Sequence, residues 1–237
     1  MRHRIHIAEA PAIGATIAIR GEEFHHAVRV VRVREREPVE LFDGRGFAAS
    51  GIIESLASDH ALVRVEAPIE SREPGVDITL AMAIIQLERF ELVLQKATEL
   101  GVRTIVPIET ERVEIRPERY RGKMERWEKI VFEATKQCGR AMIPTIEAPA
   151  DFAAVMARPG AKVLFDADME PTAKASSESV TLFIGPEGGW TERELALARE
   201  HGAAFQRLGP RRLRAETAAI VAVANLTNDR FTRRAEE

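Results

Sequence analysis

The sequence predicts an α/β fold with a parallel sheet, preceded by a small barrel-like β domain. In the first seventy residues, short apolar runs are separated by turn signals such as FDGRG at 42–46, a pattern typical of short strands. From residue 77 onward, apolar runs alternate with helical patterns, which indicates parallel strands with helices on the faces of their sheet. The segment 71–77 contains a proline, a glycine and charged residues, and we expect a linker there. The predicted domains are residues 1–72 and 73–237.

Each element of the first domain follows from a short apolar run. One stretch, EEFHHAVRVV, has the spacing of a helix and lies at 22–31. The predicted strands are 4–8, 15–19, 39–44, 47–56 and 61–67.

The strands of the second domain are continuous apolar runs, as expected for a sheet that is covered on both faces. The first helix, 88–100, has apolar side chains near one face and ends at Gly101. Those side chains are Phe90, Leu94, Ala97 and Leu100. The predicted strands are 78–85, 103–108, 161–166 and 180–185.

Composition limits the classes of protein to which the chain can belong. Its 237 residues are 45% hydrophobic and carry a formal net charge of −3, which fits a globular protein with a substantial core. No run approaches the roughly 20 apolar residues of a membrane-spanning helix, and the first residues lack the apolar region of a secretory signal. We therefore expect a cytoplasmic protein with no membrane partner. The single cysteine, Cys138, excludes an internal disulfide and a cysteine-built zinc site, and we expect no metal.

The stretch TLFIGPEGGWTERE at 181–194 runs from a predicted strand into a helix. Thr191 and Glu194 have the spacing of a capping box, and Trp190 can pack onto Leu195, so the start of the helix is clear. The three glycines before it have two interpretations. They supply the positive φ angles of a tight turn, or they form a ligand-binding loop, because open α/β sheets bind ligands at the carboxyl ends of their strands.

The same loop limits the charge of a ligand. It has no GxxxxGKS/T or GxGxxG pattern for phosphate, and Glu187 would repel an anion by about 3 kcal/mol at a separation of about 5 Å and an effective dielectric constant of about 20. The loop therefore suits a neutral or positively charged ligand with hydrogen-bond donors, such as a nucleoside or a sulfonium.

A second glycine turn lies within 206–226, where a short strand ends in a Gly-Pro turn and opens into a helix rich in alanine and valine. Two consecutive turns of this kind can share one ligand. The helix carries few charges, so it is either a central core helix or part of a subunit interface. The segment RLGPRRLR at 207–214 has four arginines and no acid, which favours an anionic partner.

Five ordered blocks of the sequence resemble one family. IGPEGGWTERE (184–194) together with LGPRRLRAETAA (208–219) resembles the RsmE family of bacterial small-subunit ribosomal RNA uridine-N3 methyltransferases, in the SPOUT superfamily. The resemblance extends to 94–113, 126–144 and, more loosely, 25–46. Three positions depart from the family pattern: Gln86 stands where a lysine is common, Ala215 where a threonine is usual, and Trp190 where a phenylalanine is found.

The resemblance implies a PUA-like RNA-binding domain followed by a trefoil-knotted α/β domain that pairs into a homodimer through its knot. It also implies that S-adenosylmethionine binds in a bent form between three loops. The substrate would be N3 of a uridine in the decoding region of 16S ribosomal RNA, either as naked RNA or in the assembled small subunit. The residues implied to bind the cofactor are Leu164, Phe165, Ile184, Gly185, Pro186, Glu187, Gly188, Gly189, Leu208, Gly209, Leu213, Arg214 and Thr217.

Methyl transfer from a sulfonium is an in-line displacement, and the uracil N3 proton must also leave. An arginine near O2 and O4 would stabilise the developing charge, with Arg214 as the first candidate and Arg140 as the second. Glu187 and Glu216 are both candidate bases, although a route through solvent hydroxide needs neither. Glu216 also suits the first turn of a helix for electrostatic reasons alone.

Basic residues of both domains are candidates for phosphate contacts, which set affinity and salt dependence. These candidates are Arg2, Arg4, His25, His26, Arg29, Arg32, Arg112, Arg211 and Arg212. Two other functions stay open. One is a non-catalytic RNA-binding ribosome assembly factor of the same fold, and the other is a small-molecule enzyme that uses the glycine turns for a nucleotide.

Overall fold

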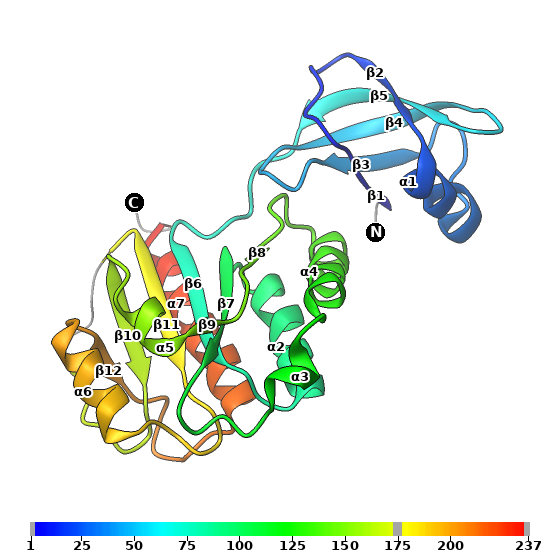
Figure 1. The fold of residues 1–237 in the computed structure, drawn as a ribbon. Helices are drawn as coiled ribbons and strands as arrows, with labels where there is room; N and C mark the ends of the chain where they lie inside the picture. Colours follow the sequence, from blue (N-terminus) through cyan, green and yellow to red (C-terminus); the bar gives the residue numbers. More distant parts are fainter. Residues whose placement is uncertain (1–2, 173–176, 235–237) are drawn as a thin grey trace. The chain divides into compact units, whose positions relative to one another are not determined.

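The computed structural model of the chain describes residues 3–172 and 177–234 (Figure 1). They divide into two compact units. The first comprises residues up to Glu73 together with Thr135–Ile143, and the second comprises Pro74–Ala134 and the residues from Pro144 onward. The sequence-based division between residues 72 and 73 does not include the return of 135–143 to the first unit.

The first unit is built on a curled sheet with the strand order β1-β3-β4-β5-β2. Strands β1 and β3 are parallel, and the other pairs are antiparallel. In β4 the alternate residues Ala49, Gly51 and Ile53 are buried, as the two-residue period of a strand requires. The elements are β1 (His3–His6), β2 (Thr16–Ile19), α1 (Gly21–His25), the π-helix η1 (His26–Val31), β3 (Pro38–Phe42), β4 (Ala48–Leu56) and β5 (Ala61–Pro68). The five predicted strands and the helical segment are confirmed.

Polar contacts fix the segment 135–143 to the first unit. The guanidinium of Arg4 donates to the carbonyl oxygens of Thr135 at 2.8 Å and Arg140 at 2.7 Å. Lys136 donates to the carboxylate of Glu23 at 2.9 Å. These partners are more than a hundred residues apart, so local sequence patterns do not reveal them.

The second unit contains an all-parallel sheet, which confirms the predicted α/β class. Within the described residues its strand order is β12-β10-β11-β6-β7-β8, with β9 also paired to β7. The strands are β6 (Asp77–Ala83), β7 (Thr104–Glu109), β8 (Thr145–Ile146), β9 (Ala150–Asp151), β10 (Ala161–Phe165), β11 (Ser179–Ile184) and β12 (Ala204–Gln206). The helices are α2 (Leu87–Glu99), α3 (Pro117–Tyr120), α4 (Met124–Cys138), α5 (Phe152–Met156), α6 (Glu192–Glu200) and α7 (Ala215–Arg234).

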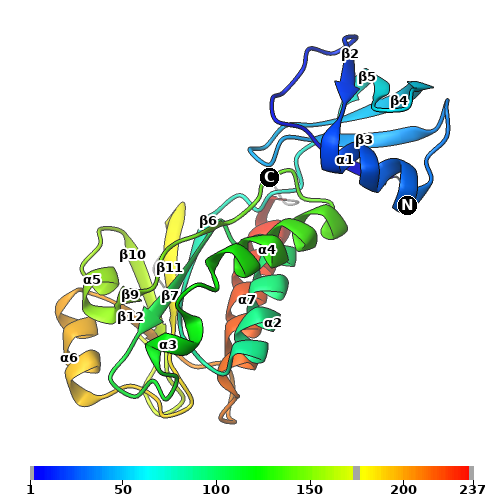
Figure 2. The same cartoon turned by 45° about the vertical axis from the view of Figure 1, so that its right-hand side comes forward.

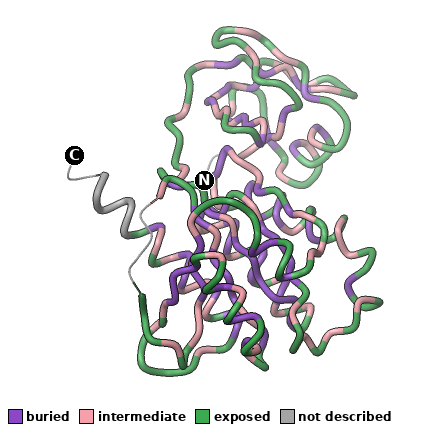
Figure 3. Tube along the Cα trace, turned by 60° about the vertical axis from the view of Figure 1, so that its left-hand side comes forward, coloured by how far each residue is buried: buried purple, intermediate pink, exposed green. Residues whose placement is uncertain are grey.

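Helices cover both faces of this sheet. Figure 2 shows α2 and α7 on one face and α5 and α6 on the other. On the α5–α6 face, the rings of Phe152 and Phe183 pack edge to face with their centroids 5.8 Å apart, and Trp190 and Phe205 belong to the same core. Figure 3 shows the buried positions concentrated in the interior of each unit.

Helix α2 confirms the sequence-based expectation for its buried face. Phe90, Leu94 and Ala97 are buried, whereas Leu100 is only half-buried because it forms the end of the helix. Gly101 follows with φ of 96°, a left-handed conformation that glycine adopts without steric penalty.

Helix α7 packs on the sheet and on α2 through Ala219, Ala222 and Val223. On its outer side Ile220 and Val221 are half-buried. None of the helices in the described part of the chain is long and apolar enough to cross a membrane. The trefoil knot that the resemblance implies stays a prediction.

Candidate functional site

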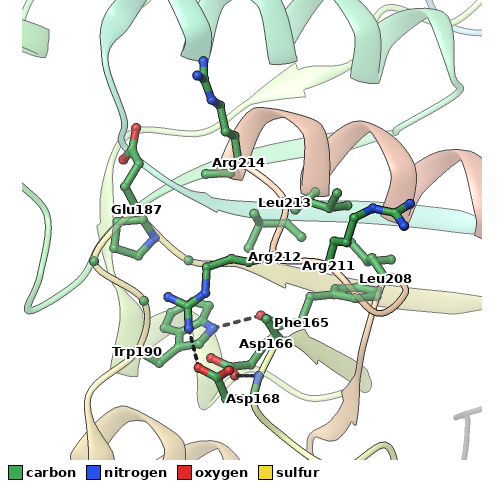
Figure 4. Close-up of a pocket in the computed structure, with 18 of the residues that line it drawn as sticks. Phe165, Asp166, Asp168, Glu187, Trp190, Leu208, Arg211, Arg212, Leu213 and Arg214 are labelled. Atoms are coloured by element: carbon green, nitrogen blue, oxygen red, sulfur yellow. Dashed lines mark hydrogen bonds and ion pairs between the residues drawn. The ribbon is translucent and has the colours of Figure 1, made fainter.

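A pocket of about 440 Å³ lies where three neighbouring strands of the second unit end (Figure 4). Strand β10 pairs with β11 on one side and with β12 on the other, so their carboxyl ends lie side by side. The loops that follow them, at 166–168, 185–190 and 208–214, line the pocket. The structure thus brings the two glycine turns of the sequence together in one site, at the edge where open α/β sheets bind ligands.

Most residues expected to hold the cofactor line this pocket. They are Phe165, Ile184, Gly185, Pro186, Glu187, Gly188, Gly189, Leu208, Gly209, Leu213 and Arg214. Two do not. Leu164 is fully buried in the sheet core, because successive residues of a strand face opposite sides, and Thr217 is exposed on α7.

The three glycines of 185–189 are required for three different reasons. A Cβ atom on Gly185 would lie 2.9 Å from Cε2 of Trp190, and one on Gly188 would lie 3.1 Å from Cβ of Arg112. Gly189 has open space beside it, but its φ of 69° disfavours other residues. The turn interpretation is therefore wrong for two of the three glycines, because Gly189 alone among them has a positive φ, whereas Gly185 and Gly188 allow close packing against Trp190 and Arg112. All three line the pocket, as the ligand-binding interpretation requires, but that interpretation stays a prediction.

Trp190 anchors the glycine loop below the pocket. Its indole nitrogen donates to the carbonyl oxygen of Phe165 at 3.1 Å, which ties the end of β10 to the loop after β11. The capping box is confirmed, because Glu194 accepts from the backbone amide of Thr191 at 2.8 Å and Thr191 accepts from that of Glu194 at 3.3 Å. The other oxygen of Glu194 accepts from the amide of Glu111 at 3.0 Å, which fixes the neighbouring loop.

Charged side chains surround the pocket. Arg212 forms an ion pair with Asp168 between two of the loops, and both side chains are largely exposed (Figure 4). Arg112 donates to the carbonyl oxygen of Gly188 at 2.9 Å. Arg211 is exposed at the same site. Arg112, Arg211 and Arg212, which we expected to contact RNA, therefore all line the pocket.

Two acidic lining residues, Asp166 and Asp168, were not among the expected site residues. Asp166 directly follows β10 and Asp168 lies two residues further on, so the rule that ligands bind at the carboxyl ends of strands could have indicated them. Trp190, Ala215 and Ala218 also line the pocket.

The candidate base Glu187 has an ion-pair partner that the sequence did not suggest. Nη1 of Arg89, in the first turn of α2, lies 3.3 Å from its Oε1. Nε of Arg89 lies 3.8 Å from Oε1 of Glu216, the other candidate base. Gln86, at the position where a lysine is common, precedes the first residue of the same helix. In Figure 4 the side chains of Glu187 and Arg214 extend in the same direction, away from Asp168.

Arg140, the second candidate for charge stabilisation, belongs to the first unit, whereas the pocket lies within the second. Its guanidinium is buried and binds the carboxylate of Glu73, with Nε–Oε2 and Nη2–Oε2 distances of 3.0 and 2.6 Å. These contacts give Arg140 a structural role there.

The RNA-binding candidates of the first unit fall into three groups. Arg2 lies outside the described residues. Arg4 is unsuited to bind phosphate, because its guanidinium is buried over the ring of Phe42 and bound to carbonyl oxygens, and burial lowers its pKa. The other four are exposed on α1, η1 and the residue that follows them. They are His25, His26, Arg29 and Arg32.

No group of three or more histidine, cysteine, aspartate or glutamate side chains in the described ranges is placed to hold a metal ion.

Family models match most of the chain. Residues 72–227 match the RNA methyltransferase domain, and residues 19–66 match the RNA methyltransferase PUA domain. Together with the parallel sheet and its pocket, these matches define the class as an RNA methyltransferase with an amino-terminal PUA domain.

Curated relatives and solved structures agree. The chain is 32% identical to ribosomal RNA small subunit methyltransferase E of Synechocystis, over 95% of this chain and 77% of the relative. It is 30% identical to the protein of that name from Bacillus subtilis, over 93% and 91%. A putative methyltransferase of Legionella pneumophila, solved with bound SAM, matches with a TM-score of 0.83 and 33% identity over 97% and 98% of the two chains. Ribosomal RNA small subunit methyltransferase E of Neisseria gonorrhoeae, bound to S-adenosyl methionine, has a TM-score of 0.83 and 29% identity over 96% and 98%. The chain belongs to the ribosomal RNA small subunit methyltransferase E family.

Proposed function

We propose that the chain is an S-adenosylmethionine-dependent methyltransferase that methylates N3 of a uridine in the 16S ribosomal RNA of the small subunit. The observation that supports this most strongly is the pocket that the ends of β10, β11 and β12 form together, at the place where the family resemblance puts the cofactor. Two relatives of known structure were solved with that cofactor bound. We place the reaction in the cytoplasm, where ribosomal RNA is found.

The residues present fit the cofactor. A volume of about 440 Å³ lies within the range of roughly 300–1,000 Å³ that is typical of small-molecule sites. Ile184, Leu208 and Leu213 offer apolar surface for a base, and the backbone of the glycine loop offers polar groups. Glu187 and Asp168 add negative charge that suits a ligand with a sulfonium and an ammonium group.

S-adenosylmethionine, when bound, supplies an electrophilic methyl group. In the reaction the methyl carbon–sulfur bond breaks, a bond forms between that carbon and N3, and the N3 proton leaves. Arg214 lies exposed beside the pocket and can stabilise the negative charge that spreads onto O2 and O4 of the base.

Of the two candidate bases, Glu187 is the more suitable. Its side chain is 42% exposed, so a substrate can approach it. Glu216 has a side chain that is only 12% exposed, and its Oε2 atom is buried. We propose that the N3 proton passes to Glu187 or to water beside it.

The first unit supports binding to RNA. His25, His26, Arg29 and Arg32 are exposed along one short helical segment and the turn after it, where they can contact phosphates without reading sequence. The substrate would be 16S ribosomal RNA, alone or in the assembled small subunit.

We also propose a homodimer. Ile220, Val221 and Ala224 form an apolar strip on the outer side of α7 and are only half-buried in the single chain. A second copy could cover this strip and remove its apolar surface from water.

Calorimetry tests the cofactor. We expect heat of binding with S-adenosylmethionine and none with ATP. Heat with ATP alone would support the nucleotide enzyme, and heat with S-adenosylmethionine but no methyl transfer to RNA would support the non-catalytic assembly factor.

A further inference from the structure

Arg89 connects two carboxylates that come from different segments of the second unit. It lies in the first turn of α2, Glu187 lies in the glycine loop, and Glu216 lies in the first turn of α7. We propose that Arg89 is a positioning residue for methyl transfer, which holds the carboxylate of Glu187 in place beside the pocket. This inference rests on the proposed function and adds a residue to it.

The location of Arg89 is unfavourable for a cation unless other groups compensate it. The amino-terminal end of a helix carries a partial positive charge, which favours acidic side chains and disfavours arginine. Glu187 and Glu216 supply the compensation, since both have an oxygen within 3.8 Å of the guanidinium. The arginine is therefore explained by its two partners and not by the helix that carries it.

The geometry requires a guanidinium. Nη1 faces Oε1 of Glu187 at 3.3 Å, whereas Nε faces Oε1 of Glu216 at 3.8 Å. Two nitrogens of one rigid planar group thus serve two different carboxylates. A lysine would provide the charge as a single flexible ammonium, but it would not fix the angle between the two partners.

The two carboxylates have unequal environments. Glu216 is buried, and its Oε2 has no hydrogen-bond partner within the described part of the chain. Glu187 is 42% exposed and belongs to the lining of the pocket. The buried Glu216 of α7 therefore holds the guanidinium of Arg89 in place, and Arg89 in turn holds the exposed carboxylate of Glu187 at the site.

A purely structural role for Arg89 would give a different experimental result. Arg89 could serve only to neutralise the buried charge of Glu216, because a buried carboxylate without a partner is strongly destabilising. In that case the removal of both charges should restore both the stability and kcat. If Arg89 instead positions Glu187, the removal of both charges still leaves Glu187 without its partner, and kcat should stay low.

The test compares Arg89→Met, Arg89→Lys and the double variant Arg89→Met/Glu216→Gln in methyl transfer to small-subunit RNA. We expect kcat to fall by about 100-fold in Arg89→Met, because a small displacement of a reacting group has an effect of this size. The double variant should recover thermal stability but not kcat. Arg89→Lys keeps the charge and should fold, yet kcat should still fall. Glu187 lines the pocket and Arg89 does not, so the loss should be larger in kcat than in the KM for S-adenosylmethionine.

Arg126→Met is the matched control. Arg126, in α4, binds Glu91 of α2 through two hydrogen bonds of 2.6 Å. Neither residue lines the pocket, so kcat should stay at the level of the unmodified chain. Recovery of kcat in Arg89→Met/Glu216→Gln, or unchanged kcat in Arg89→Lys, would overturn the inference while the proposed function stands. An unmodified chain that transfers no methyl group would overturn the proposed function itself, and the inference with it.

Discussion

Gly185 and Trp190 are so close that no side chain fits between them. A Cβ atom on Gly185 would lie 2.9 Å from Cε2 and 3.2 Å from Nε1 of the indole. The ring cannot easily withdraw, because it is buried and its nitrogen donates to Phe165. The glycine at 185 is thus a requirement of tryptophan packing as well as of the loop.

We predict that Gly185→Ala lowers the free energy of unfolding by about 1–3 kcal/mol, the usual effect of overpacking a filled core. Urea denaturation measures it. In a Trp190→Leu background the same substitution should be less destabilising, because the ring atoms that it meets are gone. An equal loss in both backgrounds would show that the contact is not the cause.

Gly188→Val should abolish the binding of S-adenosylmethionine while the chain stays folded. The added Cβ atom would lie 3.1 Å from Cβ of Arg112 and 3.4 Å from its backbone oxygen, and the two methyl groups of valine add further volume, so we expect the loop to shift from its place in the pocket lining. Calorimetry measures the binding, and circular dichroism checks the fold. Retained affinity in a folded variant would mean that the loop is only a turn.

The ion pair of Arg212 and Asp168 should control access to the pocket. Both side chains are largely exposed, so loss of the ion pair should change the free energy of unfolding by less than about 1 kcal/mol. We expect Arg212→Ala to increase the dissociation rate of S-adenosylmethionine in stopped-flow experiments, because the two loops are then no longer connected by this pair.

The matched control for that variant is Arg20→Ala. Arg20 and Asp59 form a similarly exposed ion pair at 2.6 Å, but in the first unit. If Arg20→Ala and Arg212→Ala give the same dissociation rate, the pair at the pocket has no effect on access.

Local features of the second unit could be predicted from the sequence. The end of α2 at Gly101 and the capping box at Thr191 depend on residues within a few positions of one another, and the structure confirms both. The pairing of two glycine turns in one pocket could also be predicted, because parallel strands place their carboxyl ends together.

Contacts between distant segments could not be predicted in this way. In the sequence Arg4 is a basic residue suited to bind phosphate. In the structure the segment 135–143 folds back, and its carbonyl oxygens accept the hydrogen bonds of the Arg4 guanidinium. The role of Arg89 could not be predicted for the same reason, since its partners Glu187 and Glu216 lie in segments that are distant in the sequence. The reason for Gly185 depends on where Trp190 packs, which also requires the folded chain.

Tyr120 should titrate at unusually high pH. It is buried, and its hydroxyl donates to Glu109; burial and this hydrogen bond raise its pKa from the ordinary 10.0 to about 12. Because folding favours the protonated form, the stability from this group is complete below pH 10 and is lost as the pH rises toward about 12.

Tyr120 is the one tyrosine of the chain, so tyrosinate absorbance reports it directly. We expect a midpoint of about 12 in the folded protein and a smaller loss of stability between pH 10 and 12 in Tyr120→Phe. A midpoint near 10.0 would contradict the buried contact with Glu109.

The most direct test of the account is methyl transfer itself. Small ribosomal subunits and naked 16S RNA, both from a strain that lacks this gene, are incubated with the chain and S-adenosylmethionine that carries a labelled methyl group. Mass spectrometry of the digested nucleosides should then show labelled N3-methyluridine. A label on another base or on the ribose, or no label while the cofactor binds, would contradict the account.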